Sequence, residues 1–98
     1  MFLADVIGTV VAPVQHPVLE GERLLLLRPV DPEGRAGGLM RVAIDRSQAG
    51  EGDRVLCVDE GNAGRQLLAA PDAPVKTVIV GVVDYVELDG RHVFDARG

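Results

Sequence analysis

Cysteine, histidine and aromatic residues are all scarce in this 98-residue sequence, which has one cysteine, two histidines, two phenylalanines, one tyrosine and no tryptophan. Because Cys57 is the only cysteine, no disulfide can form within the chain, and a reducing compartment fits this composition. The net charge is -5 and the isoelectric point is about 4.8. Nucleic-acid binding needs a basic surface and stacking aromatic side chains, so the sequence disfavours a nucleic-acid partner.

Long hydrophobic segments are also missing. No apolar run approaches the ~18 residues that span a bilayer, and the start of the chain lacks the basic and apolar regions of a signal peptide. The negative charge further disfavours docking on anionic lipid. We therefore expect a soluble, cytoplasmic protein with no membrane partner.

The sequence offers no recognisable catalytic or metal-binding pattern. His16 and His92 lie far apart and belong to no metal-ligand spacing, so we interpret each as an ordinary structural or surface histidine. Cys57 lies within an apolar segment and is interpreted as a buried small hydrophobe rather than a nucleophile. The G-x-S-x-G and H-E-x-x-H motifs are absent. The sequence therefore predicts no enzyme activity, no metal site and no cofactor.

Aliphatic side chains, in contrast, are abundant, and 47% of the residues are apolar. Two runs, Leu24 to Leu27 and Val78 to Val83, do not alternate between apolar and polar residues. Successive side chains of a strand point to opposite faces, so both faces of these segments are expected to be covered. In a small domain one face is the core. Another copy of the chain is the simplest cover for the other face, which predicts an oligomer.

The chain reads as a single, mainly β domain spanning residues 1–98. Gly8 within the first strand predicts a bulge or a close backbone approach, and Asp89-Gly90 predicts a type I′ hairpin turn. Short strands at close spacing, with one short helix and a C-terminal hairpin, predict a small five- to six-stranded barrel. The expected strands are 2–14, 22–30, 39–45, 53–58, 77–88 and 91–96.

The segment GNAGRQ, residues 61–66, follows a predicted strand and precedes a short helix. Strand, glycine turn and helix is also the order of a phosphate-binding loop, but the segment lacks both the lysine and the glycine spacing of those loops. We interpret Asn62 as the N-cap of a helix that ends before Pro71.

Several segments together resemble the bacterial microcompartment vertex proteins, which include the carboxysome and ethanolamine-utilisation pentamers. The resemblance runs from about residue 3 to residue 94. It implies an OB-like barrel that assembles into pentamers at the fivefold vertices of a polyhedral shell, next to hexameric shell proteins of the same microcompartment. It also implies a structural protein without a catalytic site. The segments are GTVV (8–11), LLLL (24–27), D-x-x-G (31–34), AGEGDRVL (49–56), GNAGRQ (61–66) and PVKTVIVGVVD (74–84).

By the same resemblance, one loop is placed near the fivefold axis as the pore lining: Ser47, Gln48, Ala49 and Gly50. The family usually has glycine where this chain has Gln48, so five glutamines would narrow an opening there. Arg65 and Gln66 are expected to make contacts within or between subunits. Two alternatives from other classes stay open: an OB-like binding module, and a small oligomeric barrel with a ligand site between subunits.

Overall fold

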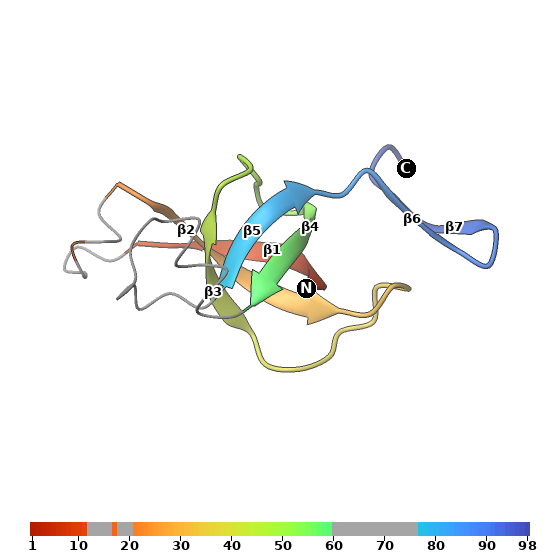
Figure 1. The fold of residues 1–98 in the computed structure, drawn as a ribbon, viewed down its shortest axis with the longest axis horizontal. Helices are drawn as coiled ribbons and strands as arrows, with labels where there is room; N and C mark the ends of the chain where they lie inside the picture. Colours follow the sequence, from red (N-terminus) through yellow and green to blue (C-terminus); the bar gives the residue numbers. More distant parts are fainter. Residues whose placement is uncertain (12–16, 18–20, 60–76) are drawn as a thin grey trace.

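The computed structural model describes residues 1–11, 17, 21–59 and 77–98. Its described part consists of strands joined by turns and loops (Figure 1). The helix expected after Asn62 and the site residues Arg65 and Gln66 lie outside the described residues. The strands are β1 (Phe2–Val10), β2 (Arg23–Val30), β3 (Arg41–Asp45), β4 (Arg54–Asp59), β5 (Thr77–Val82), β6 (Tyr85–Leu88) and β7 (Arg91–Asp95).

The first five strands close into a barrel in the order β1-β2-β3-β5-β4, which confirms the predicted mainly β, small-barrel fold. The neighbouring strands are antiparallel except β3 and β5, which pair in parallel through Ile44↔Val78. Closure leaves none of the five strands as an open edge, and this removes the row of unpaired backbone groups that invites aggregation.

The core fills the interior of the barrel because side chains alternate along each strand. In β2, Leu25 and Leu27 point inward and are fully buried, whereas Leu24 and Leu26 lie on the outer face and are half-buried. Burying one such leucine stabilises the fold by ~1.5–3 kcal/mol. The core cluster contains Ala4, Val6, Leu25, Leu27, Ala43, Ala49, Val55, Cys57 and Ile79.

Two glycine-based predictions are confirmed. The β1–β2 register shifts between Val6 and Gly8, which is the bulge expected there. Asp89 and Gly90 have φ angles of 53° and 78°. Both are positive, as a type I′ turn requires, and the turn joins β6 to β7.

The predicted strand 77–88 was wrong as a single element. It divides at Val83 and Asp84 into β5, which belongs to the barrel, and β6, which pairs only with β7. The Val83 N–H donates to the Arg54 carbonyl at 2.8 Å, and the Asp84 carbonyl accepts from the Ala96 N–H at 2.8 Å. The backbone thus changes partners at this point, from β4 to the returning C-terminal segment.

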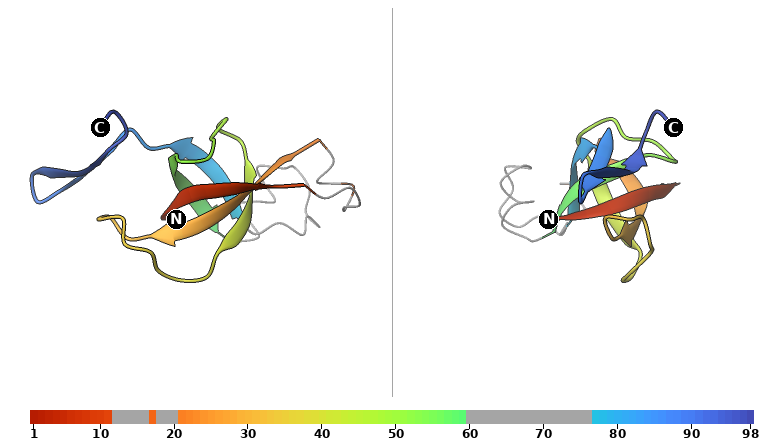
Figure 2. Two further views of the ribbon diagram at one scale, coloured as in Figure 1. Left: turned by 180° about the vertical axis from the view of Figure 1, so that it is seen from behind. Right: turned by 90° about the vertical axis from the view of Figure 1, so that its right-hand side faces the viewer.

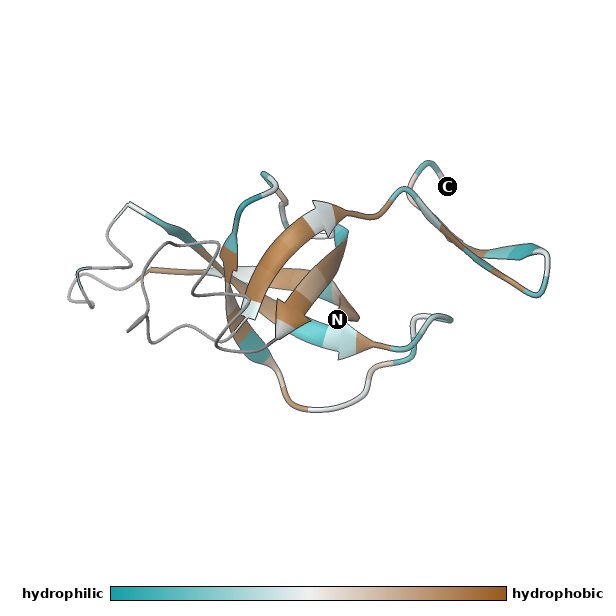
Figure 3. Cartoon of the chain, in the orientation of Figure 1, coloured by the Kyte–Doolittle hydropathy of each residue, from teal (hydrophilic) through white to brown (hydrophobic). Residues whose placement is uncertain are grey.

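The β6–β7 hairpin projects away from the barrel, as the views from two sides show (Figures 1 and 2). Apolar residues concentrate on the barrel strands, and the outer end of the hairpin is hydrophilic (Figure 3). The described residues form no helix of the length and hydrophobicity needed to cross a membrane.

Candidate functional site

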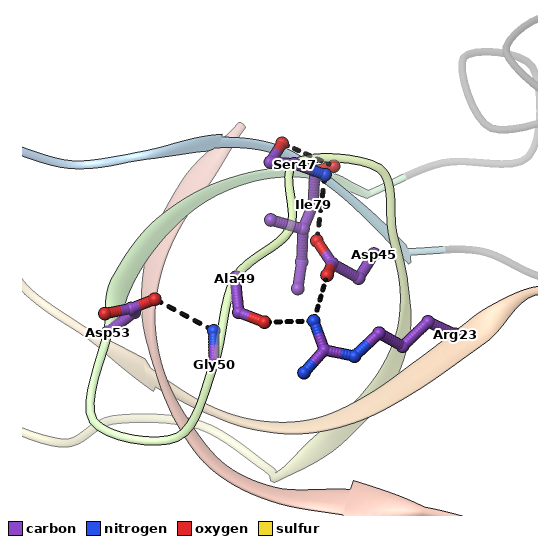
Figure 4. A network of polar contacts seen from close by, with 7 residues as sticks. All are labelled: Arg23, Asp45, Ser47, Ala49, Gly50, Asp53 and Ile79. Carbon is purple, nitrogen blue, oxygen red and sulfur yellow. Dashed lines mark hydrogen bonds and ion pairs between the residues drawn. The ribbon is translucent and has the colours of Figure 1, made fainter.

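The loop that joins β3 to β4 folds over one end of the barrel. Ala49 at its centre lies over the barrel interior (Figure 4) and is 1% exposed. It belongs to the same core cluster as Leu25 and Val55. The loop is therefore held by the core itself and closes this end of the barrel.

Asp45, the last residue of β3, holds the loop in place through hydrogen bonds to its side chain. Its side chain is 1% exposed, and Arg23 Nη1 donates to its Oδ2 at 2.9 Å. The same Nη1 donates to the Ala49 carbonyl, and the Ser47 N–H donates to Asp45 Oδ1 at 2.9 Å (Figure 4). A buried carboxylate with charged and backbone donors on both oxygens fixes the loop in one position.

Further hydrogen bonds secure both ends of the loop. Arg46 N–H and Ser47 Oγ donate to the Ile79 carbonyl at 3.3 and 3.4 Å, which ties the loop to β5. Beyond Ala49, the Gly50 N–H donates to Asp53 Oδ2 at 2.8 Å. Arg46 Nη2 pairs with Glu22 Oε2 at 3.0 Å, so Arg46, like Arg23, has a carboxylate partner.

The four residues expected to line a pore differ in where their side chains lie. Ala49 is buried in the core of its own chain, so its methyl group offers nothing to a pore. Gln48 is exposed, and Ser47 and Gly50 are partly exposed. Gln48 has a φ of 58°, in the left-handed region that residues with a Cβ enter at a cost. Its side chain therefore projects from a rigid, strained turn.

A second cluster lies where the C-terminal hairpin meets the barrel. Arg54 Nε and Nη2 donate to the two oxygens of Asp5 at 2.8 and 3.1 Å, and the Phe94 ring lies 4.3 Å from the guanidinium carbon. The Arg54 side chain is only 10% exposed. Gly34 has a φ of +88°, and a Cβ there would lie 3.0 Å from Arg54 Nη2, so glycine suits both the backbone and the space.

The outer side of β1, β2 and β3 carries an uncovered apolar surface. Val10 pairs with Leu24, and Leu26 pairs with Val42, which places these four side chains in two adjacent rows. Val42 is 47% exposed, and the other three are half-buried. We name these four residues the outer apolar face. The expectation that another copy of the chain covers the outer side of Leu24 to Leu27 stays a prediction, because the structure holds a single chain.

The remaining sequence predictions concern Cys57 and the histidines. Cys57 is fully buried, as predicted. His92 stacks on Tyr85 with ring centres 4.4 Å apart, and its Nδ1 lies 3.5 Å from Asp95 Oδ2. His16 lies outside the described residues. Within the part of the chain that is described, no three His, Cys, Asp or Glu side chains gather as a metal-binding set.

The sequence analysis missed both polar clusters. Arg23 and Asp45 are 22 positions apart, and Arg54 and Asp5 are 49 apart. Neither spacing matches a local motif, because the contacts arise from strand register across the barrel. The sequence does place charged residues at the ends of apolar strands. Charged residues at such positions are usually exposed to solvent, so they did not indicate ion pairs.

Known proteins resemble this chain over almost its whole length. Residues 1–84 match the family described as "Ethanolamine utilisation protein EutN/carboxysome". The bacterial microcompartment shell vertex protein EutN of Escherichia coli K12 is 38% identical over 96% of this chain and 98% of its own length. The carboxysome shell vertex protein CcmL of Nostoc is 35% identical over 99% and 96%.

Solved structures give the same result. The structure of Gloeobacter violaceus CcmL matches with a TM-score of 0.90 and 32% identity, over all of both chains. A pentameric microcompartment shell protein from Rhodospirillum rubrum, GrpN, matches with a TM-score of 0.78 and 28% identity, over 90% of this chain and 99% of its own. The barrel, its closing loop and the projecting hairpin therefore belong to a chain that is a member of the EutN/CcmL family.

Proposed function

We propose that this chain is a structural subunit of a bacterial microcompartment shell, which assembles as a homopentamer and occupies the vertices of that shell. The observation that carries the proposal is the likeness to CcmL over all of both chains, with a TM-score of 0.90. The uncovered outer apolar face supports it, since an exposed apolar strand surface of this kind marks a contact with another chain.

In this role the chain works through assembly rather than catalysis. Five barrels form a ring, and the ring fills a fivefold position that hexameric shell proteins of the same microcompartment cannot fill. The shell places the protein in the cytoplasm, around enclosed enzymes. Two polar clusters, centred on Asp45 and Arg54, hold the loop and the hairpin in fixed positions, and a rigid subunit suits a tile.

The loop at the barrel end is the proposed pore lining. Gln48 and Ser47, with the Gly50 backbone, face the fivefold axis, and five glutamine side chains narrow any opening there. The fixed position of the loop supports this placement, because a ring of mobile loops would not hold a defined opening. Arg65 and Gln66 stay candidates for contacts at the subunit boundary.

Native mass spectrometry of the purified protein tests the assembly. The expected mass is five times that of the 10.4 kDa chain. A stable monomer at micromolar concentration would defeat the proposal, and a hexamer would defeat the vertex role while keeping the oligomer. A filter-binding assay at low salt distinguishes the shell subunit from the alternative of an OB-like binding module. The binding module would retain single-stranded nucleic acid on the filter, whereas the shell subunit would not.

A further inference from the structure

The β6–β7 hairpin is the part of the described chain in which a single charge should matter most. Among the described strands, β6 and β7 pair only with each other, and the two-stranded sheet projects from the barrel (Figure 2). A two-stranded hairpin is at best marginally stable in water, even with a favourable type I′ turn. A small change in the energy of such an element therefore changes how often it opens.

One face of the hairpin gathers ionisable side chains around His92. Glu87 lies directly opposite His92 in the strand register, and Tyr85 lies opposite Asp95. Because Tyr85 and Glu87 are two positions apart on β6, both pairs lie on the same face of the sheet. The register shift between these pairs gives β7 the extra residue that brings His92 and Asp95 to one face. We name Tyr85, Glu87, His92 and Asp95 the His92 cluster.

The imidazole of His92 contacts both a ring and a carboxylate. It stacks on Tyr85 with ring centres 4.4 Å apart and 10° between the ring planes. Its Nδ1 lies 3.5 Å from Asp95 Oδ2, whereas Asp95 Oδ1 accepts from the Arg97 N–H at 2.9 Å. Hydrogen bonds from Arg97 and, with a smaller effect, from His92 hold the pKa of Asp95 below its ordinary value. The two oxygens of Asp95 thus serve different partners.

The charges on this face balance only when His92 carries a proton. Glu87 and Asp95 are negative and Arg97, which lies beside Asp95, is positive. One negative charge is therefore in excess while the imidazole is neutral, and protonation of His92 cancels it. The other charged side chains of residues 84–98 lie at the base of the hairpin, in its turn or next to that turn: Asp84, Asp89 and Arg91.

The direction of the effect follows from these contacts. Histidine is the side chain whose charge ordinarily changes between pH ~5 and ~8. In the closed hairpin the imidazolium has two carboxylates and a tyrosine ring as neighbours, and each of these favours a cation. Opening the hairpin removes these neighbours. The stabilisation is thus fully present below the ordinary imidazole titration near pH ~6.5, and it is lost as the pH rises through the titration of the closed hairpin.

We propose that His92 makes the β6–β7 hairpin a pH-sensitive element, which closes more firmly as the pH falls from ~8 to ~5.5. Opposite charges across a hairpin and a cation on an exposed ring are small effects, so the ratio of closed to open hairpin rises about 2- to 5-fold. Because the side chains of the His92 cluster are partly exposed, salt at ~1 M weakens this rise. The inference concerns the hairpin itself and stands apart from the proposed pentamer.

Amide hydrogen exchange of the full-length protein, followed by NMR, tests this inference. Protection factors corrected for the intrinsic effect of pH should rise about 2- to 5-fold in β6 and β7 between pH ~8 and ~5.5, and should stay constant in the barrel core. His92→Gln should remove the rise. The matched control His16→Gln removes the other histidine of the chain and should keep it.

The outcomes divide clearly. A constant protection in the wild type, a rise that persists in His92→Gln, or a rise that is lost in His16→Gln overturns the proposal. Glu87→Gln covers the case in which His92→Gln does not fold, because it keeps the imidazole and removes the exposed carboxylate opposite it. It should reduce the rise, and a rise equal to that of the wild type contradicts the electrostatic cause.

The fluorescence of Tyr85 gives a second measurement. The chain has one tyrosine and no tryptophan, so its emission comes from the His92 cluster. A stacked imidazolium quenches a phenol ring, and the emission should therefore fall as His92 is protonated. His92→Gln should show no such step. A wild-type emission that stays constant between pH ~8 and ~5.5 contradicts the proposal.

Discussion

The guanidinium carbon of Arg54 lies 4.3 Å from the centre of the Phe94 ring, while Arg54 Nε donates to Asp5 Oδ1 at 2.8 Å. One side chain in β4 therefore contacts both the first strand of the barrel and the C-terminal hairpin. The hairpin has its own sheet, so this contact is a main determinant of how it leaves the barrel.

Replacing Arg54 with methionine keeps an apolar stem and removes the cation. We expect Arg54→Met to lower the free energy of unfolding by about 1–3 kcal/mol, because two charge-assisted hydrogen bonds in a mostly buried position are lost. Urea denaturation measures the change. Phe94→Leu completes a double-mutant cycle. The double variant Arg54→Met/Phe94→Leu should lose about 0.5–1 kcal/mol less unfolding free energy than the sum of the two single losses. Strict additivity would show that the ring and the cation do not interact.

The sequence was most informative where local chemistry decides the structure. Gly8 predicted a bulge and Asp89-Gly90 a type I′ turn, and both are present because only a few residue types suit those backbone conformations. The strands of the barrel were found because their β-branched and aliphatic runs end at turn residues.

The sequence was least informative where distant segments meet. The break at Val83-Asp84 lies within a run of good strand formers, and it depends on hydrogen bonds to Arg54 and Ala96. The burial of Ala49 depends on the loop turning into the barrel, which no local pattern encodes. Such features come from tertiary contacts, which override local propensity.

Removing the Asp45 carboxylate should loosen the loop at the barrel end. Asp45→Ala leaves the Ser47 N–H without its acceptor and Arg23 without its carboxylate partner, and we expect a loss of about 2–3 kcal/mol in unfolding free energy. Thermal and urea denaturation measure it. The control Glu33→Gln removes an exposed pair with Arg35 and should cost less than about 1 kcal/mol. Equal losses for the two variants would argue against a special role for Asp45.

Gln48 is predicted to be in a strained conformation. Its φ of 58° suits glycine or asparagine better than a side chain with a longer or branched stem. Gln48→Gly should raise stability by up to about 1 kcal/mol, since the strain relieved exceeds the extra freedom of the unfolded chain. Gln48→Val should lower it by about 1–2 kcal/mol. The melting temperatures should follow the order Gly, Gln, Val, and a valine variant as stable as wild type would refute the strain.

The thiol of Cys57 should be protected in the folded protein. The residue is fully buried in the barrel core, and a buried thiol reacts only when the structure opens. Labelling with a thiol reagent is expected to be slow under native conditions and fast in denaturant. The exposed control Glu51→Cys should label rapidly at its new thiol. Rapid stoichiometric labelling of the native wild type would contradict the burial.

The stability of the turn at residues 31–35 should fall at acid pH, when the Asp31 carboxylate is protonated. The Arg35 backbone N–H and then the Arg35 side chain donate to the Asp31 carboxylate and lower its pKa below the ordinary value of 3.8. A lowered folded-state pKa means that the stabilisation is fully present above 3.8 and is lost as the pH falls through the folded value. Carbon NMR titration of the carboxyl group should find the lowered pKa directly. The stability difference between wild type and Asp31→Asn should shrink in strong acid. The control Glu51→Gln removes a carboxylate from a different turn and measures the general effect of losing one negative charge. A difference that stays constant across the acid range would show that the Asp31 charge does not hold the turn.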